Sequence, residues 1–312
     1  MDTSYTLWVL LAIALLGSWF FASGPWARLL LALSRRAAGL RSRTILVDGI
    51  QWHYLEGGSG PLLVALHGFG GDADNWFRAA PRLRPHFHII APDLPGFGET
   101  GAPGDLAFDI ESQVERLHDF LQELQVKPVV MAGNSMGGWL AAAYALAHPE
   151  TVRGLWLLAP LGVASVPRSP MLEAIDQGYE NPLSISTTDQ YRRRVVQTMF
   201  GRVPWIPRPL MKYYARKGVQ ASADATTRFR QVARSPEALE AIVRGLEQPI
   251  HLQWGSLDRA VNPEGARALT QERPDIDIHL LEGIGHLPML EAPRESSNRW
   301  LAFCRRHNIL DT

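Results

Sequence analysis

Cysteine is almost missing from this sequence, since Cys304 is the only one among 312 residues. A disulfide within the chain is therefore excluded, as is a metal cluster built on several thiolates. No group of histidine, cysteine and carboxylate residues has the spacing of a metal site, so we expect neither a metal nor a cofactor. An excess of charge is missing too, because 31 basic residues balance 31 acidic ones. This balance argues against a polyanionic partner such as nucleic acid.

Charged side chains are also absent from Thr3 to Ala27. Within this stretch, Tyr5 to Ala22 is mostly apolar and reaches the length of a transmembrane helix, which needs about 20 such residues. A cleaved signal peptide is the main alternative, because Ala22-Ser23-Gly24 offers small residues for cleavage. A signal peptide should begin with positive charge, however, and only Asp2 precedes the apolar run. We therefore predict an N-terminal, single-pass transmembrane helix.

The segment from Trp26 to Arg43 alternates apolar turns with five arginines. This pattern predicts a basic juxtamembrane helix on anionic headgroups, with a solvated linker helix as the alternative. Residues 1–43 would then form an anchor unit. Because the arginines follow the apolar run, the positive-inside rule places the rest of the chain in the cytoplasm. Ala14 and Ser18 form one small-xxx-small pair, which leaves a possible homodimer open.

Short strands and helices alternate after Arg43. The first two strands should form an antiparallel hairpin, and six apolar runs are typical of buried, mainly parallel strands. Helical patterns cover Ile110–Leu124 and Trp139–His148. The class is therefore α/β, with a core formed by residues 44–160 and 249–312. The predicted strands are Thr44–Val47, Gln51–Leu55, Leu62–Leu66, His88–Ala91, Val129–Ala132, Leu155–Ala159, Ile250–Trp254 and Ile276–Leu281.

Residues 161–248 break this alternation. The segment is rich in proline, contains no convincing strand and shows helical patterns around Gln190–Phe200, Pro209–Gly218 and Pro236–Leu246. We interpret it as a helical cap, or lid, over the strand ends where α/β proteins bind ligands. Tyr191 to Lys217 holds eight basic residues and no acidic one, which fits either a solvated helix face or contact with anionic lipid.

The strongest chemical signal is Gly133-Asn134-Ser135-Met136-Gly137, between a predicted strand and a predicted helix. A G-x-S-x-G turn in this setting raises the serine hydroxyl above the edge of the sheet. The glycines permit the tight turn. We predict that Ser135 is a nucleophile.

A serine hydroxyl needs a base, and the base needs an orienting carboxylate. Asp258 follows one late strand and His286 follows the last, which gives the chain order Ser, acid, His. Asp275 and Asp277 are alternatives for the acid, but they enter a strand rather than follow one. The alternative for His286 is a structural histidine of the loop.

The tetrahedral intermediate of acyl transfer also needs donors for its oxyanion. His67-Gly68-Phe69-Gly70-Gly71 follows a strand and can turn sharply. We expect the backbone N–H groups of Phe69 and Met136 to form the oxyanion hole. His67 should be structural, and the turn Asp93–Gly98 receives no chemical role.

These segments together resemble the α/β-hydrolase family, and more narrowly its bacterial membrane-anchored lipase and phospholipase A branch. The likeness runs from about Thr44 to the C-terminus and includes Asn181-Pro-Leu183 and Gly285-His-Leu-Pro-Met-Leu-Glu291. It implies an α/β-hydrolase fold with helices on both faces of the sheet, and it implies the same triad and oxyanion donors. Gly255-Ser-Leu-Asp258 departs from the family, whose members often carry a second acidic or polar residue there.

The same resemblance implies a protein of the bacterial inner (cytoplasmic) membrane whose catalytic domain faces the periplasm, against the arginine count. We therefore expect a serine esterase that acts on membrane lipids such as glycerophospholipids or acylglycerols and releases fatty acid. One alternative is a carbon–carbon bond hydrolase, although that branch has an aromatic residue where this chain has Leu287. Another is a non-catalytic lipid-binding scaffold, although a scaffold should have a degraded triad.

Overall fold

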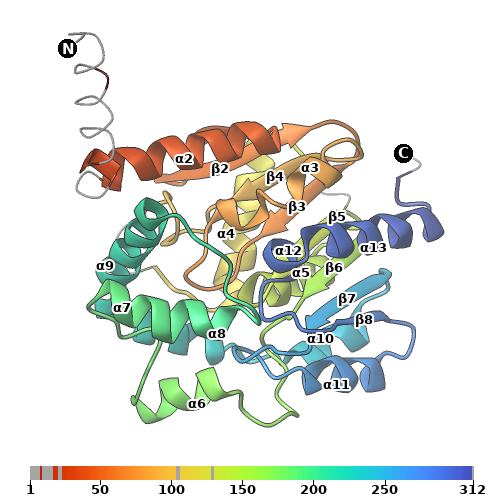
Figure 1. Ribbon diagram of the computed structural model, residues 1–312. Helices are drawn as coiled ribbons and strands as arrows, with labels where there is room; N and C mark the ends of the chain where they lie inside the picture. The colour runs from red at the N-terminus through yellow and green to blue at the C-terminus, as the bar shows by residue number, and fades with distance from the viewer. Residues whose placement is uncertain (1–7, 9–16, 20–22, 103–105, 128–129, 311–312) are drawn as a thin grey trace.

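The computed structural model of the chain describes residues 8, 17–19, 23–102, 106–127 and 130–310. Its centre is a mixed sheet in the order β1-β2-β4-β3-β5-β6-β7-β8. β1 pairs antiparallel with β2, β2 pairs antiparallel with β4, and all further neighbours are parallel (Figure 1). The strands are β1 (Arg41–Val47), β2 (Ile50–Gly58), β3 (Leu62–Leu66), β4 (His88–Pro92), β5 (Val130–Asn134), β6 (Gly154–Leu158), β7 (Ile250–Gly255) and β8 (Asp277–Leu281).

Helices cover both faces of the sheet, because successive side chains of a buried strand point to opposite faces. In β3, Leu62, Val64 and Leu66 join one apolar cluster, whereas Leu63 and Ala65 join the other. The first cluster packs under α4 (Ile110–Glu123), α5 (Met136–Ala147), α10 (Leu239–Gly245) and α11 (Glu264–Glu272). The second packs under α3 (Ala80–Leu83), the 3₁₀ helix η1 (Ala73–Trp76), α12 (Pro288–Glu291) and α13 (Pro293–Arg306).

The structure confirms the predicted α/β class and its mainly parallel sheet. Two boundaries were wrong at the first hairpin. β1 begins at Arg41 and not at Thr44, and β2 ends at Gly58 and not at Leu55. Arg41 pairs with Glu56 in register, and Arg43 also forms an ion pair with the Glu56 side chain at 3.2 Å. The end of the predicted basic helix is therefore strand, because cross-strand pairing extends the hairpin toward the N-terminus.

The segment between β6 and β7 is helical, as expected. It contains α6 (Pro170–Gln177), α7 (Thr188–Gln190), a π-helical turn (Tyr191–Val196), α8 (Gln197–Met199) and α9 (Arg208–Ala233). α9 has 26 residues and continues well beyond the predicted Pro209–Gly218. α7, α8 and α9 lie together at one end of the sheet, and α9 packs against α2 (Ser23–Ala38) (Figure 1). α10, at the end of the same segment, packs instead against α5 and α11.

α2 begins the well-described part of the chain and lies along the body of the molecule. Ser23, Ala27, Leu31 and Ala38 form its buried face, at the spacing of one helical stripe. The predicted transmembrane segment, Tyr5–Ala22, lies mostly outside the described residues. Among the residues that are described, no helix combines the length and the apolar character needed to cross a bilayer.

Candidate active site

Ser135 occupies a strained turn between β5 and α5. Its φ of 55° and ψ of −120° lie where a residue with a side chain is rarely found. The flanking glycines make this turn possible. A Cβ on Gly133 would lie 2.0 Å from the Gly137 oxygen, and one on Gly137 would lie 2.5 Å from the His67 oxygen. The Ser135 N–H donates to Leu158 of the neighbouring strand at 3.0 Å, which holds the turn at the edge of the sheet.

Asp258 and His286 are in direct contact. The Asp258 Oδ2 and the His286 Nδ1 lie 2.8 Å apart, and both side chains are buried. The second carboxylate oxygen accepts N–H groups from Ala260 at 2.8 Å and Val261 at 3.0 Å. The Trp254 indole also donates to Oδ2 at 3.1 Å. A carboxylate held by so many donors fixes the orientation of the imidazole.

The two alternative acids lie elsewhere. Asp277 forms a pair with His251 at 2.9 Å, and it also contacts Arg306. Asp275 forms an exposed pair with Arg273 at 3.0 Å. Neither carboxylate forms an ion pair or hydrogen bond with His286 in the described part of the chain.

Asn134 connects the serine turn to the histidine loop. Its side-chain amide donates to the main-chain oxygen of His286 at 2.9 Å and to that of Leu158 at 3.0 Å. Ser135 itself is only 7 % exposed. Asn134 is not among the site residues predicted from the sequence, although its place inside the G-x-S-x-G motif is a signal for such a role. The structure thus brings the surroundings of Ser135, Asp258 and His286 to one edge of the sheet.

The glycine-rich loop after β3 lies directly over the serine turn. A Cβ on Gly68 would approach the Ser135 Cβ to 3.0 Å. His67 is fully buried and ties the loop: its Nδ1 lies 2.7 Å from the Gly68 oxygen, and its Nε2 accepts the Leu94 N–H at 3.0 Å. Burial lowers the pKa of His67, so the neutral imidazole is favoured.

The two residues predicted to donate to the oxyanion, Phe69 and Met136, belong to the glycine-rich loop and to α5. Phe69 follows the Gly68 turn, and Met136 is the first residue of α5, where helical N–H groups have no partner within the helix. The Phe69 ring makes edge contacts with Phe97 and with Phe229 of α9, at centroid distances of 5.1 and 5.2 Å. These contacts fix the loop from both the core and the cap.

A second Ser–His–Asp arrangement was not anticipated from the sequence. The Ser42 Oγ lies 2.7 Å from the His53 Nε2, and the His53 Nδ1 lies 2.8 Å from the Asp93 Oδ2. Asp93 also accepts the main-chain N–H groups of Ala73 and Glu99, each at 2.6 Å. Burial raises the pKa of Asp93, but the bonds from His53 and these N–H groups outweigh it and hold the pKa low. Because Ser42 lies on the antiparallel edge strand β1, we assign this arrangement a structural role.

Within the described ranges, no group of three or more histidine, cysteine, aspartate or glutamate residues could hold a metal ion. Cys304 is buried among the residues of the second apolar cluster, and burial raises the pKa of its thiol.

Comparison with known proteins places this geometry in a family. The family model for the α/β-hydrolase fold matches residues 61–293. Lipase 1 of Psychrobacter immobilis is 31 % identical over 83 % of this chain and 82 % of its own length, and Lipase 3 of Moraxella sp. strain TA144 is 30 % identical with the same coverage. The crystal structure of a membrane phospholipase A, a bacterial virulence factor, is 33 % identical, covers 99 % of both chains and has a TM-score of 0.88. The chain belongs to the α/β-hydrolase family.

Proposed function

We propose that this protein is a serine esterase that hydrolyses carboxylic esters of lipids, as a lipase or phospholipase A does. The observation that carries the proposal is the buried contact between Asp258 and His286, joined through Asn134 to the turn that presents Ser135. Ester hydrolysis by a serine needs this combination of an oriented base and a turn that presents the serine at the sheet edge.

In the proposed mechanism, the Ser135 Oγ attacks the acyl carbonyl carbon while the His286 Nε2 takes the hydroxyl proton. Asp258 keeps the proton on Nδ1 and stabilises the imidazolium without being protonated itself. The N–H groups of Phe69 and Met136 donate to the oxyanion. As the ester C–O bond breaks, His286 returns the proton to the departing alcohol. Water activated by His286 then cleaves the acyl-enzyme and releases the fatty acid.

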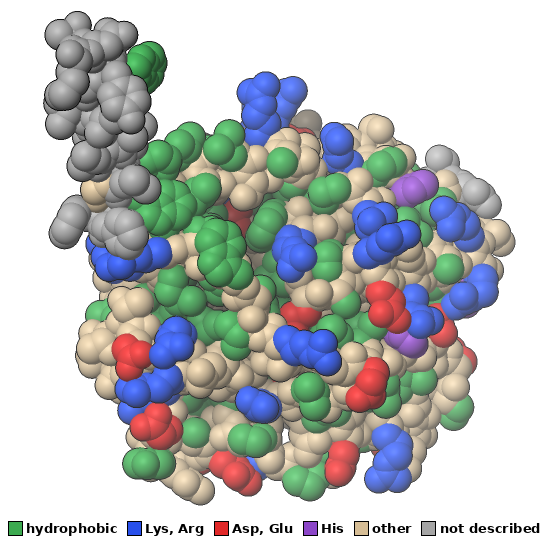
Figure 2. Space-filling model, in the orientation of Figure 1, with side chains coloured by type: hydrophobic (Ala, Val, Ile, Leu, Met, Phe, Trp, Pro, Cys, Tyr) green, Lys and Arg blue, Asp and Glu red, His purple; other side chains and the backbone are tan. Residues whose placement is uncertain are grey.

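A lipid substrate is supported by the relatives and by the surface. The relatives named above are lipases and a phospholipase A. Figure 2 shows apolar side chains gathered along α2 and in the hollowed surface between α2 and the cap helices. An acyl chain needs such an apolar surface beside the ester bond.

Membrane association is part of the same proposal. On the outer side of α2, Leu29 is 47 % exposed and Leu33 is 54 % exposed, and Arg28 and Arg36 are exposed beside them. Exposed leucines with flanking arginines suit the boundary between headgroups and acyl chains. Arg35 differs, because it turns inward to Asp74 and Glu99, both at 2.8 Å. We propose that α2 lies on the membrane after an anchor at Tyr5–Ala22, with the catalytic domain in the periplasm.

The test compares purified, detergent-solubilised protein with its Ser135→Ala variant. Both are incubated with phospholipid vesicles, with an acylglycerol and with p-nitrophenyl butyrate, and the released acids are measured. We expect release by the wild type, sensitivity to a fluorophosphonate probe, and loss of both release and probe labelling in the variant. A folded wild-type protein that released no acid from any of the three esters would contradict the proposal.

A further inference from the structure

The cap segment 199–201, which begins at the last residue of α8, lies with its backbone against the backbone of the loop that carries His286. A Cβ on Gly285 would lie 2.3 Å from the Gly201 nitrogen and 2.7 Å from the Met199 oxygen. A Cβ on Gly201 would lie 2.7 Å from the Gly283 oxygen. Only glycine allows so close an approach from both sides. In addition, the His286 N–H donates to the Met199 oxygen at 2.8 Å. The cap segment 199–201 is thus packed onto the histidine loop.

The carboxylate of Glu291, the last residue of α12, joins these two segments. Its Oε1 accepts the N–H of Gly285 at 2.9 Å and, more weakly, that of Leu287 at 3.4 Å. Its Oε2 accepts the N–H of Gly201 at 2.9 Å. One carboxylate therefore holds the residues on both sides of His286 and, at the same time, Gly201 of the cap.

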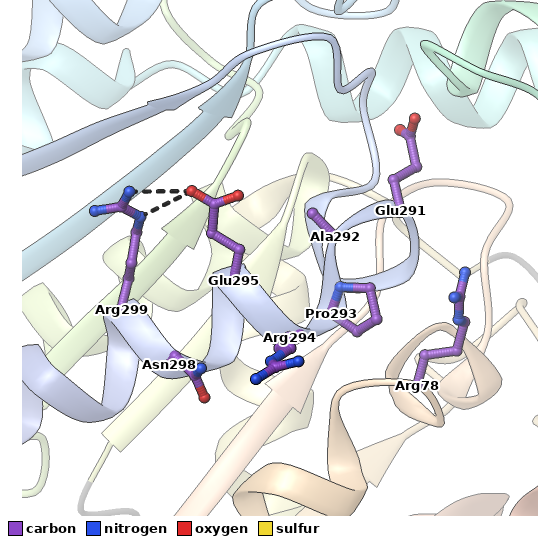
Figure 3. Close-up of a pocket in the computed structure, with 8 residues that line it drawn as sticks. All are labelled: Arg78, Glu291, Ala292, Pro293, Arg294, Glu295, Asn298 and Arg299. Carbon is purple, nitrogen blue, oxygen red and sulfur yellow. Dashed lines mark hydrogen bonds and ion pairs between the residues drawn. The ribbon is translucent and has the colours of Figure 1, made fainter.

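Figure 3 shows where this carboxylate lies. Glu291 is at one end of a shallow groove of about 670 Å³ on the surface of α12 and α13, and its side chain points away from Glu295 and Arg294. Glu295 instead pairs with Arg299 along the exposed side of the groove, at 3.0 Å. Two glutamates in one groove thus have different tasks: Glu295 makes an ion pair with a neighbour on its own helix, and Glu291 binds main-chain N–H groups.

We propose that Glu291 is a positioning residue for His286, and that it couples the histidine loop to the cap. This inference rests on the proposed function. The carboxylate binds the residues before and after His286, so it fixes the position of the imidazole relative to Ser135. Because the second oxygen holds Gly201, the loop keeps this position while the cap segment 199–201 is docked. A shift of about 1 Å in a catalytic group can cost roughly 100-fold in rate, so small losses of position are measurable.

A purely structural role would be the alternative. Glu291 reaches back to the N–H of Leu287, which precedes α12, as a helix-capping carboxylate does. Loss of this helix-capping hydrogen bond would lower the free energy of unfolding and would leave the rate per folded molecule unchanged. The two roles are separated by the kcat of the folded protein.

The test uses Glu291→Gln, Glu291→Ala and the matched control Glu295→Gln in the full-length protein with p-nitrophenyl butyrate. Glutamine keeps one acceptor oxygen but turns its NH₂ group toward an N–H, so it should release one of the two segments, whereas alanine releases both. We expect kcat to fall about 10-fold in Glu291→Gln and about 100-fold in Glu291→Ala, with KM changed less than about threefold. Glu295→Gln should keep kcat within about twofold.

Amide hydrogen exchange supplies a second readout that does not need activity. Both Glu291 variants should exchange faster at residues 199–201 and 283–287, and Glu295→Gln should not. If Glu291→Gln is folded, keeps kcat within twofold of the active wild type and leaves this exchange unchanged, the positioning role is wrong. A wild type without esterase activity would instead refute the proposed function, and the exchange data would still decide whether Glu291 couples cap and loop.

Discussion

The side-chain amide of Asn134 and the main-chain oxygen of His286 lie 2.9 Å apart, although 152 positions separate the two residues in the chain. The same amide nitrogen also donates to Leu158 of β6 at 3.0 Å. One buried amide therefore connects the serine turn, the neighbouring strand and the histidine loop. The position of Ser135 relative to His286 depends on this connection. Asn134 precedes Ser135 in the chain and binds the main-chain oxygen of His286 itself.

Replacement of Asn134 by alanine should affect both activity and stability. The His286 oxygen loses the Asn134 amide, and the Leu158 oxygen keeps only the Ser135 N–H, which together cost about 1–3 kcal/mol in the free energy of unfolding. We expect kcat for a soluble ester to fall about 10-fold with little change in KM, since the loss concerns alignment and not substrate contact. Urea unfolding and steady-state kinetics measure the two effects. Asn262→Ala, which removes an exposed hydrogen bond to Pro167, is the control.

Much of the fold could be predicted because it follows from local pattern. β3 occupies the predicted Leu62–Leu66, and its five residues are all buried, as a continuous apolar run in a parallel sheet should be. The turn at Ser135 was predictable for the same reason, because the G-x-S-x-G motif is typical of a sharp turn between a strand and a helix. Tertiary packing explains the differences: α9 continues to Ala233 because Phe229 and Val232 bury against the core.

The parts of the site that escaped prediction depend on contacts between distant segments. Glu291 lies in a recognisable motif, but its bond to Gly201 crosses 90 positions and has no periodic signal. The buried pair of His53 and Asp93 joins two strands in the same way. The sequence pattern indicates only a core residue at Trp254, and the folded structure reveals that its indole donates to Asp258. Polar partners of this kind follow from the folded geometry and not from spacing.

Asp258→Asn tests the proposed acid directly. An amide in this position presents N–H or oxygen to His286 but cannot stabilise the imidazolium, and it favours the wrong tautomer. We expect kcat to fall about 10³- to 10⁴-fold while probe labelling of Ser135 slows in parallel. Asp275→Asn, in the exposed pair with Arg273, should stay within about twofold of the wild type. Equal activity of Asp258→Asn and the wild type would exclude Asp258 as the acid.

The ion pair of Asp72 and Lys217 connects α9 of the cap to the glycine-rich loop that follows β3. Asp72 precedes η1, but its side chain does not cap the helix, and the Ala73 N–H donates to Asp93. The Asp72 Oδ2 accepts from the Lys217 Nζ of α9 at 3.2 Å, and its Oδ1 is buried without a hydrogen-bond partner. Burial raises the pKa of Asp72 to about 7, so the carboxylate depends strongly on the lysine.

Lys217→Met should therefore destabilise the protein most at alkaline pH. At pH 8.5 the buried carboxylate loses its partner, and we expect about 2 kcal/mol less unfolding free energy, since Lys217 is partly exposed. Below pH 6 the carboxyl group is protonated and the loss should shrink. Asp72→Asn combined with Lys217→Met should cost no more than Lys217→Met alone, which a double-mutant cycle detects. The exposed Lys127→Met is the control, and a pH-independent loss would contradict the pairing.

His251 should make the protein sensitive to mild acid. His251 lies on β7 and is buried against α13, where its ring contacts Phe303. Its Nε2 accepts from the Gln253 amide at 2.7 Å. Burial lowers the pKa of His251 to about 4, against the opposing effect of Asp277. The unfolded chain binds a proton near pH 6.5 and the folded chain does not, so stability falls as the pH drops from 6.5 toward 4.

Over that window the expected loss is about 3 kcal/mol, at 1.4 kcal/mol for each unit of pKa difference. His251→Gln removes the titrating group, so its unfolding free energy should fall less steeply with acid than that of the wild type, whatever its value at pH 7. Urea unfolding of both proteins between pH 4 and pH 7 measures the two slopes. Parallel slopes would mean that His251 is already protonated in the folded protein, and the acceptor role of its Nε2 toward Gln253 would then be wrong.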